Sequence, residues 1–283
     1  MPISSLSDAV LKLTGGSNGN PEAIWWFKDP TSVAYTVTLG RMYSLWTYAG
    51  NPCVGTAPTA SAVPTNATDG SMRQTNASGG RTKYLTGLYA MMKIQGALIL
   101  YDRLVHQAGL SGTTTGAQTT NLPTSALTRY SGAASVGNQI WLEIYSPVGT
   151  TATTVSATYT NESGTGSKTT PLVTFGGTGE LEQTRMIHLP LATGDTGVRS
   201  VESVTLSAST VSAAGNFGVT IVRPLALIAN ISSGAGAVTD YITGKPGPVP
   251  IADNACLALM YDPASTTQAS FFLTGALQFV ESA

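Results

Sequence analysis

The sequence predicts a mainly β protein: a β-sandwich or jelly-roll-like core with an irregular N-terminal region and extended arms. Three observations support this fold class. After Asn138, apolar or alternating runs recur between turn-forming clusters, as in antiparallel sandwiches. The chain has 31 glycines and 15 prolines, an above-average share that indicates many turns. Residues 97–106 form a long apolar run between Gly96 and Gly109, which suits a long strand.

The first 50 residues contain three candidate elements. Apolar residues at helical spacing predict a short helix from Ser5 to Leu13, which a glycine-rich stretch ends. Residues 24–27, Ile-Trp-Trp-Phe, indicate either a core strand or a patch that stacks on carbohydrate or docks a partner. Residues 33–48 alternate well enough to be strand. The interface candidates in this region are Trp25, Trp26 and Phe27.

Residues 51–81 have the composition of a linker or surface arm. They are rich in Ala, Thr, Ser, Pro, Asn and Gly, have few large apolar side chains, and are not expected to cover a core. Arg73 and Arg81, with Lys83 just beyond, are candidates to meet acidic groups on a neighbouring subunit. Residues 82–92 carry apolar side chains at helical spacing and predict a short helix or a turn.

These observations divide the chain into an irregular N-terminal region, residues 1–90, and a β-sandwich domain, residues 91–283. The sandwich begins with the long strand at 97–106, which His106 is expected to end. Residues 109–124 contain almost nothing apolar and predict an exposed loop or arm that orders against a partner. The interface candidates in this arm are Thr113, Thr114, Thr119 and Asn121.

Eight further runs predict the strands that complete the sandwich. Gly- and Pro-rich turn clusters separate them, and the last run ends close to residue 283, where it could seal a sheet or a subunit interface. The runs are residues 139–146, 153–160, 171–175, 185–191, 198–207, 217–228, 255–262 and 269–280.

Composition excludes several function classes. Charged residues are 10% of the chain and the net charge is −1, compared with about 25% charged residues in ordinary soluble domains, so we expect no nucleic-acid partner. No window of apolar residues is long enough to span a membrane, and residues 1–13 lack the features of a signal peptide. Cys53 and Cys256 are expected to be two unrelated buried thiols rather than one bridge.

The chain carries no recognisable catalytic or metal-binding motif. His106 and His188 are far apart, and neither has a second His or Cys at ligand spacing. No Gly-x-Ser-x-Gly lies on a strand-to-helix turn, since the one at residues 15–19 follows the predicted helix, and no pair of carboxylates is picked out by spacing as in a glycosidase. Asp102 and Arg103 are adjacent, so in a strand they point to opposite faces and bond different neighbours. We therefore expect no enzyme, no cofactor and no metal.

Three segments together resemble a family of structural proteins from tailed bacteriophages. They begin IQGALILYDRLVHQAGLSGT, QIWLEIYSPVGTTATTV and GDTGVRSVESVTLSAST, and the resemblance covers about residues 90–228. It implies a β-rich virion component, assembled in the host cytoplasm, with no reaction and no cofactor. We expect a capsid decoration or cement protein that binds the major capsid protein or other virion proteins as a homo-oligomer, most simply a trimer.

Two alternatives remain open from the sequence. One is a tail, neck or baseplate structural protein, which the copy number per virion would distinguish from a capsid protein. The other is a glycan-binding receptor protein that stacks sugars on exposed tryptophans. Its stacking candidates are Trp25, Trp26, Trp46 and Trp141.

Overall fold

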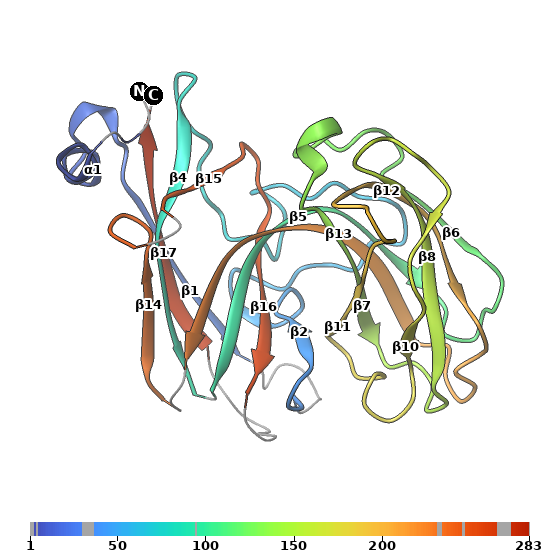
Figure 1. Ribbon diagram of the computed structural model, residues 1–283. Helices are drawn as coiled ribbons and strands as arrows, with labels where there is room; N and C mark the ends of the chain where they lie inside the picture. The colour runs from blue at the N-terminus through green and yellow to red at the C-terminus, as the bar shows by residue number, and fades with distance from the viewer. Residues whose placement is uncertain are drawn as a thin grey trace.

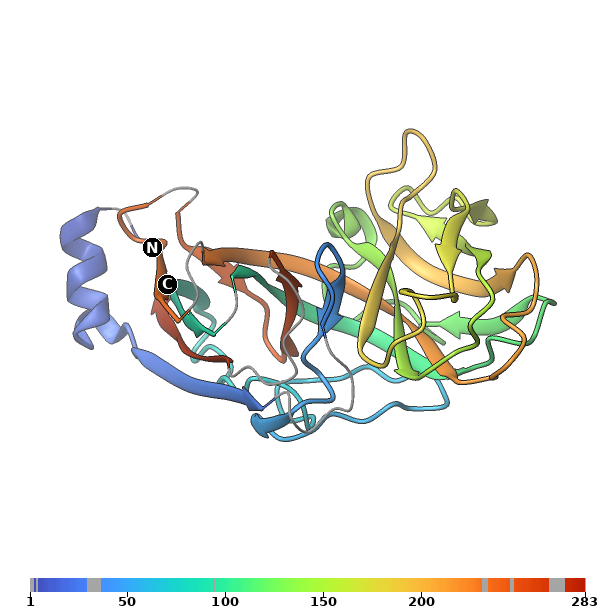
Figure 2. The ribbon, with the colours of Figure 1, turned by 90° about the horizontal axis from the view of Figure 1, so that it is seen from below.

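A computed structural model describes residues 3, 5–29, 37–93, 95–230, 234–244, 247–264 and 273–282. The mainly β prediction is confirmed, because the described strands build antiparallel sheets that pack as layers. The molecule is elongated, with one sheet at each end and a barrel between them (Figure 1 and Figure 2). Parts of the predicted strands at 33–48 and 269–280 lie outside the described residues.

The first sheet lies at the end of the molecule that holds both termini (Figure 1). Its strand order is β14 (Gly236–Asp240), β4 (Thr82–Met92), β17 (Leu273–Ser282), β1 (Glu22–Asp29) and β3 (Ala49–Asn51), and β15 (Val249–Ile251) also pairs with β4. The predicted helix at Ser5–Leu13 is confirmed as α1 (Leu6–Leu13), and η1 (Gly16–Asn18) follows it. The boundary predicted at residue 90 falls inside β4.

Six strands close into the central barrel, and a second sheet covers its far side. The barrel order is β11 (Arg185–Leu189), β2 (Met42–Ser44), β16 (Leu257–Pro263), β5 (Gly96–Leu110), β13 (Asn216–Asn230) and β7 (Gln139–Ser146). The second sheet is β10 (Val173–Phe175), β8 (Thr153–Asn161), β12 (Val198–Leu206) and β6 (Gln118–Leu122), with β9 (Lys168–Thr169) on β8 and η3 (Gly132–Ser135) nearby.

Alternation along the barrel strands produces three separate cores. On β16, Leu257 and Leu259 face the first sheet, whereas Ala258 and Met260 fill the barrel. On β7, Leu142 faces the second sheet by the same rule. Each barrel wall thus forms a two-layer sandwich with the sheet it faces, and the predicted strands of residues 139–228 and 255–262 are confirmed.

The prediction of a short helix or turn at 82–92 is wrong, since these residues form β4. Leu85 and Leu88 are both fully buried in the core beneath the first sheet. The register against β17 shifts between them, which leaves Thr86 as an extra residue in the strand. Because of this β-bulge, Leu85 and Leu88 point to the same face of the strand although they are three positions apart in the sequence. The apolar residues of this strand therefore have the spacing that is typical of a helix.

The prediction that residues 51–81 are a free arm unable to cover a core is also wrong. Backbone bridges join Ala62 to His106 and Met72 to Leu257, and the Met72 side chain is 1% exposed. Gly55 lies so close to Trp46 that an added Cβ would stand 2.2 Å from the indole ring. The segment covers the core with backbone and small residues, which composition alone did not indicate.

Candidate docking face and barrel mouth

The outer face of the first sheet, turned away from the barrel, is apolar and open. One cross-strand row, from β14 to β1, is Val238, Tyr89, Ala276 and Trp25. The neighbouring row is Gly236, Met91, Thr274 and Phe27. Trp25 is 73% exposed, Val238 59% and Phe27 52%. We call the surface of Trp25, Phe27, Tyr89, Met91 and Val238 the apolar face.

The apolar face is grooved rather than flat. The large side chains of β1 and β4 form two ridges, and β17 between them carries the small residues Thr274 and Ala276. A hollow of about 400 Å³ lies along this strip, lined among others by Trp25, Tyr89 and Met91. Exposed patches of this kind on soluble proteins mark interaction surfaces.

Strict alternation along β1 explains how the chain exposes these aromatics. Trp26 and Lys28 point inward and are 1% and 2% exposed, whereas Trp25 and Phe27 point outward. The Lys28 Nζ donates to the carbonyl oxygens of Tyr48 at 3.1 Å and Pro52 at 2.8 Å, and burial lowers the pKa of Lys28 to about 8. Residues 24–27 are therefore both core strand and exposed patch, the two possibilities that the sequence left open.

Helix α1 covers one end of the same outer face, next to the termini (Figure 1). It contacts β17, where Val280 is fully buried, and a hollow of about 320 Å³ remains between Ala9 and Tyr84. The helix buries Ala9 and leaves Leu6 59% and Val10 52% exposed. The described residues leave the rest of this outer face uncovered.

The basic interface candidates have acidic partners within the chain. Arg73 pairs with Asp69 at 2.6 Å on the surface, and Arg81 reaches Glu281 at 3.4 Å. Lys83 is 1% exposed and pairs with Glu22 at 2.5 Å. Of these three ion pairs, only Arg81–Glu281 ties the segment before β4 to the first sheet, through β17, and a role for the arginines at an interface stays a prediction.

The polar interface candidates lie at the opposite end of the molecule. Thr113 and Thr114 belong to an exposed turn, where the Thr113 and Ser111 hydroxyls are 2.9 Å apart. Thr119 and Asn121 are exposed on β6, at the second sheet (Figure 1). The predicted arm at 109–124 is thus an exposed turn followed by a strand paired with β12, and the structure does not bring these residues near the apolar face.

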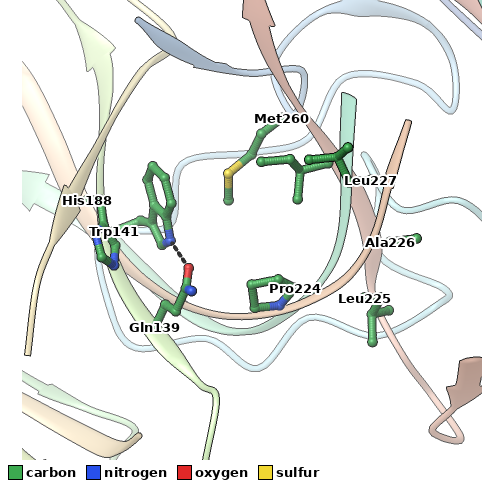
Figure 3. Close-up of a pocket in the computed structure, with 9 residues that line it drawn as sticks. Gln139, Trp141, His188, Pro224, Leu225, Ala226, Leu227 and Met260 are labelled. Atoms are coloured by element: carbon green, nitrogen blue, oxygen red, sulfur yellow. Dashed lines mark hydrogen bonds between the residues drawn. The ribbon is translucent and has the colours of Figure 1, made fainter. Parts of the chain in front are cut away.

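A third hollow, of about 500 Å³, opens at one end of the barrel (Figure 3). Trp141 donates from Nε1 to Gln139 Oε1 at 3.0 Å, and the His188 ring lies 4.9 Å from the indole. Partial burial lowers the pKa of His188. The other lining residues are Ile99, Pro224, Leu225, Ala226, Leu227 and Met260. A single histidine without a carboxylate among these residues provides no catalytic dyad.

The barrel interior holds a buried polar network centred on Arg103, which is fully buried. Its guanidinium donates to Glu143, which is also fully buried, to the Tyr145 hydroxyl at 2.6 Å and to Thr220 at 3.2 Å. The guanidinium also lies 4.5 Å from the Trp46 ring. Burial alone would lower the pKa of Arg103, but Glu143 beside it holds that pKa above its ordinary value. The network keeps an ion pair inside a barrel that is otherwise apolar.

His106 belongs to this network, so the prediction that it ends a strand is wrong. It lies inside β5 and its Nδ1 accepts from Arg103 Nε at 2.9 Å. The register of β5 against β13 shifts at Leu104, which places residues 103 and 106 on one face. Burial, and then the charge of Arg103, lower the pKa of His106 well below 6.5. The imidazole is held neutral and is a structural group.

Asp102 points to the opposite face of β5 from Arg103, which confirms the prediction that these two adjacent residues bond different neighbours. It accepts from Arg129 Nε at 2.8 Å and Nη2 at 2.9 Å, and from the backbone N–H of Cys256 at 2.9 Å. Cys256 is buried and Cys53 is exposed, and both thiols are free. The absence of a bridge agrees with the prediction, but the expectation that both thiols are buried is wrong for Cys53.

In the part of the chain that the structure describes, no group of three His, Cys, Asp or Glu side chains could hold a metal ion. No described helix is long and apolar enough to cross a membrane. Trp26 and Trp46 are 1% exposed and Trp141 is 9% exposed, so Trp25 alone of the four stacking candidates presents its ring to solvent.

Comparisons with known proteins give no family. No protein-family model matches the chain, and no curated protein matches it. The crystal structure of the infectious bursal disease virus VP2 subviral particle is 8% identical, with 93% of this chain and 81% of that chain covered and a TM-score of 0.18. The T=1 particles derived from infectious bursal virus are 10% identical, with 93% and 78% covered and a TM-score of 0.19. Likeness at this level carries no argument about function.

Proposed function

We propose that this chain is a structural component of a tailed-phage virion, and specifically a capsid decoration or cement protein bound to the major capsid lattice. The observation that carries the proposal is the apolar face. Trp25, Phe27 and Val238 are each more than half exposed on one four-stranded surface. Leaving so much apolar surface in water is unfavourable, and a partner that covers it gains the corresponding hydrophobic free energy.

Two further observations support an assembly role. The net charge of −1 and the 10% of charged residues mean that little electrostatic repulsion opposes close packing of subunits. The resemblance of about residues 90–228 to structural proteins of tailed phages is the reason for proposing a phage virion as the assembly. The proposed function includes no reaction and no cofactor.

Quantitative mass spectrometry of purified particles of the encoding phage tests this function. A decoration protein should be present at hundreds of copies, in proportion to the major capsid protein, and the double variant Trp25→Ser/Phe27→Ser should be incorporated less. Leu172→Ser is the matched control, because Leu172 is 65% exposed away from the first sheet. A count of six or twelve copies per particle would refute the capsid role and favour a neck or baseplate role. Absence from the particle would refute any virion role.

A further inference from the structure

The apolar face has the shape and chemistry to pack against itself, and we propose that its occupant is a second copy of this chain. Two copies would meet face to face across the first sheet, related by a two-fold axis. The inference rests on the proposed assembly function and names the first partner in that assembly. The trimer expected from the sequence would use different, head-to-tail contacts.

The arrangement of large and small side chains supports self-packing. Trp25 and Phe27 form a ridge on β1, and next to them β17 presents the shallow strip at Thr274 and Ala276. A two-fold axis parallel to the strands, placed between β1 and β17, lays the ridge of each copy over the strip of the other. The β1 ridge of each copy then fills the groove of the other, as in sandwiches whose sheets pack about 10 Å apart, while β4 lies opposite β3 and β14 lies at the edge of the overlap.

The available area is sufficient for a stable pair. A fully covered aromatic side chain buries about 150–250 Å², so the five partly exposed side chains of the apolar face offer on the order of 500 Å² per copy. Two faces together reach about 1,000 Å², roughly the lower bound of a specific interface. The backbone and small residues between the ridges add to that total.

The charges around the face favour a copy over a charged partner. The described residues of the two central rows include no Lys, Arg, Asp or Glu. In the next row, Asp240 lies on β14, at the rim, while Gly87, Gln278 and Ala23 continue across the sheet. A strongly basic or acidic partner would find no matching charges at the centre, whereas a second apolar face meets no repulsion there.

Sedimentation equilibrium of the full chain, from nanomolar to high micromolar, tests the proposal. The wild type should double in mass, and acrylamide should quench Trp25 less as the mass rises, because Trp26, Trp46 and Trp141 are already covered. The double variant Trp25→Ser/Phe27→Ser should weaken dimerisation at least about 30-fold, since two central aromatic anchors are lost. Leu172→Ser should leave the dimer unchanged.

Both substituted residues of the double variant are exposed, so it should keep the urea midpoint of the wild type, and that measurement separates lost pairing from lost folding. A wild type that stays monomeric throughout would overturn the proposal. So would a dimer or trimer whose mass the double variant does not change. Copy number in the virion is measured independently. If the protein is a monomer but is present at hundreds of copies per particle, the dimer proposal is refuted and the proposed function stands. If it is a dimer but is absent from particles, the dimer proposal stands and the proposed function is refuted.

Discussion

Replacing Arg103 by methionine is the most informative perturbation of the barrel. The change keeps much of the side-chain volume and removes the charge opposite Glu143, whose side chain has 0% exposure. Glu143 would then retain one donor, the Tyr145 hydroxyl at 2.9 Å, and its Oε1 has no hydrogen-bond partner among the described residues. Breaking one side of a buried ion pair costs about 3–5 kcal/mol, so we expect Arg103→Met to lower the free energy of unfolding by about that amount.

Urea unfolding at neutral pH, followed by tryptophan fluorescence, measures this loss. The double variant Arg103→Met/Glu143→Leu should recover most of it, because both buried charges are removed together. Arg73→Met is the matched control: its pair with Asp69 is more than half exposed on both sides, and its loss should cost less than about 1 kcal/mol. Equal costs for Arg103→Met and Arg73→Met, or simple additivity in the double variant, would refute the buried-network account.

Three further predictions concern pH and proteolysis. The lowered pKa of His106 means that the unfolded chain binds its proton first, so stability should fall as pH drops below 6.5, and His106→Gln should flatten that part of the unfolding profile. Lys28, with its pKa lowered to about 8, should make the wild type gain stability as pH rises from about 8 towards 10.5, and Lys28→Met should lose this gain. In limited proteolysis followed by mass spectrometry, early cuts should fall at residues 113–117, whereas early cuts within 51–81 would contradict the packing of that segment.

Period-two patterns in the sequence predicted most of the strands correctly. The run at residues 153–160 alternates because one side faces a core, and that requirement is visible in single residues. The spacing of apolar residues predicted the wrong structure where a β-bulge shifts the strand register. Leu85 and Leu88, like Arg103 and His106, share a strand face only because an extra residue lies between them, and that register depends on a partner strand far away in the chain.

The candidate site was predicted in part. The aromatic run at 24–27 was recognised, but which rings are buried follows from the pairing of β1 with β17, about 250 residues later in the chain. Tyr89, Met91 and Val238 were missed, because they join Trp25 only through the strand order of the first sheet. The packing of residues 51–81 was missed for a related reason. Close contact through Gly55 and backbone bridges has no signature in hydrophobic content.

Hydroxyl-radical footprinting of the full chain across a concentration series tests the docking role of the apolar face most directly. Oxidation is scored by mass spectrometry at Trp25, Phe27 and Met91, with Leu172 and Val211 as exposed residues away from the first sheet. We predict that the first three become protected as the chain associates while the other two stay reactive. Association that leaves Trp25 as reactive as in the dilute protein would contradict the account.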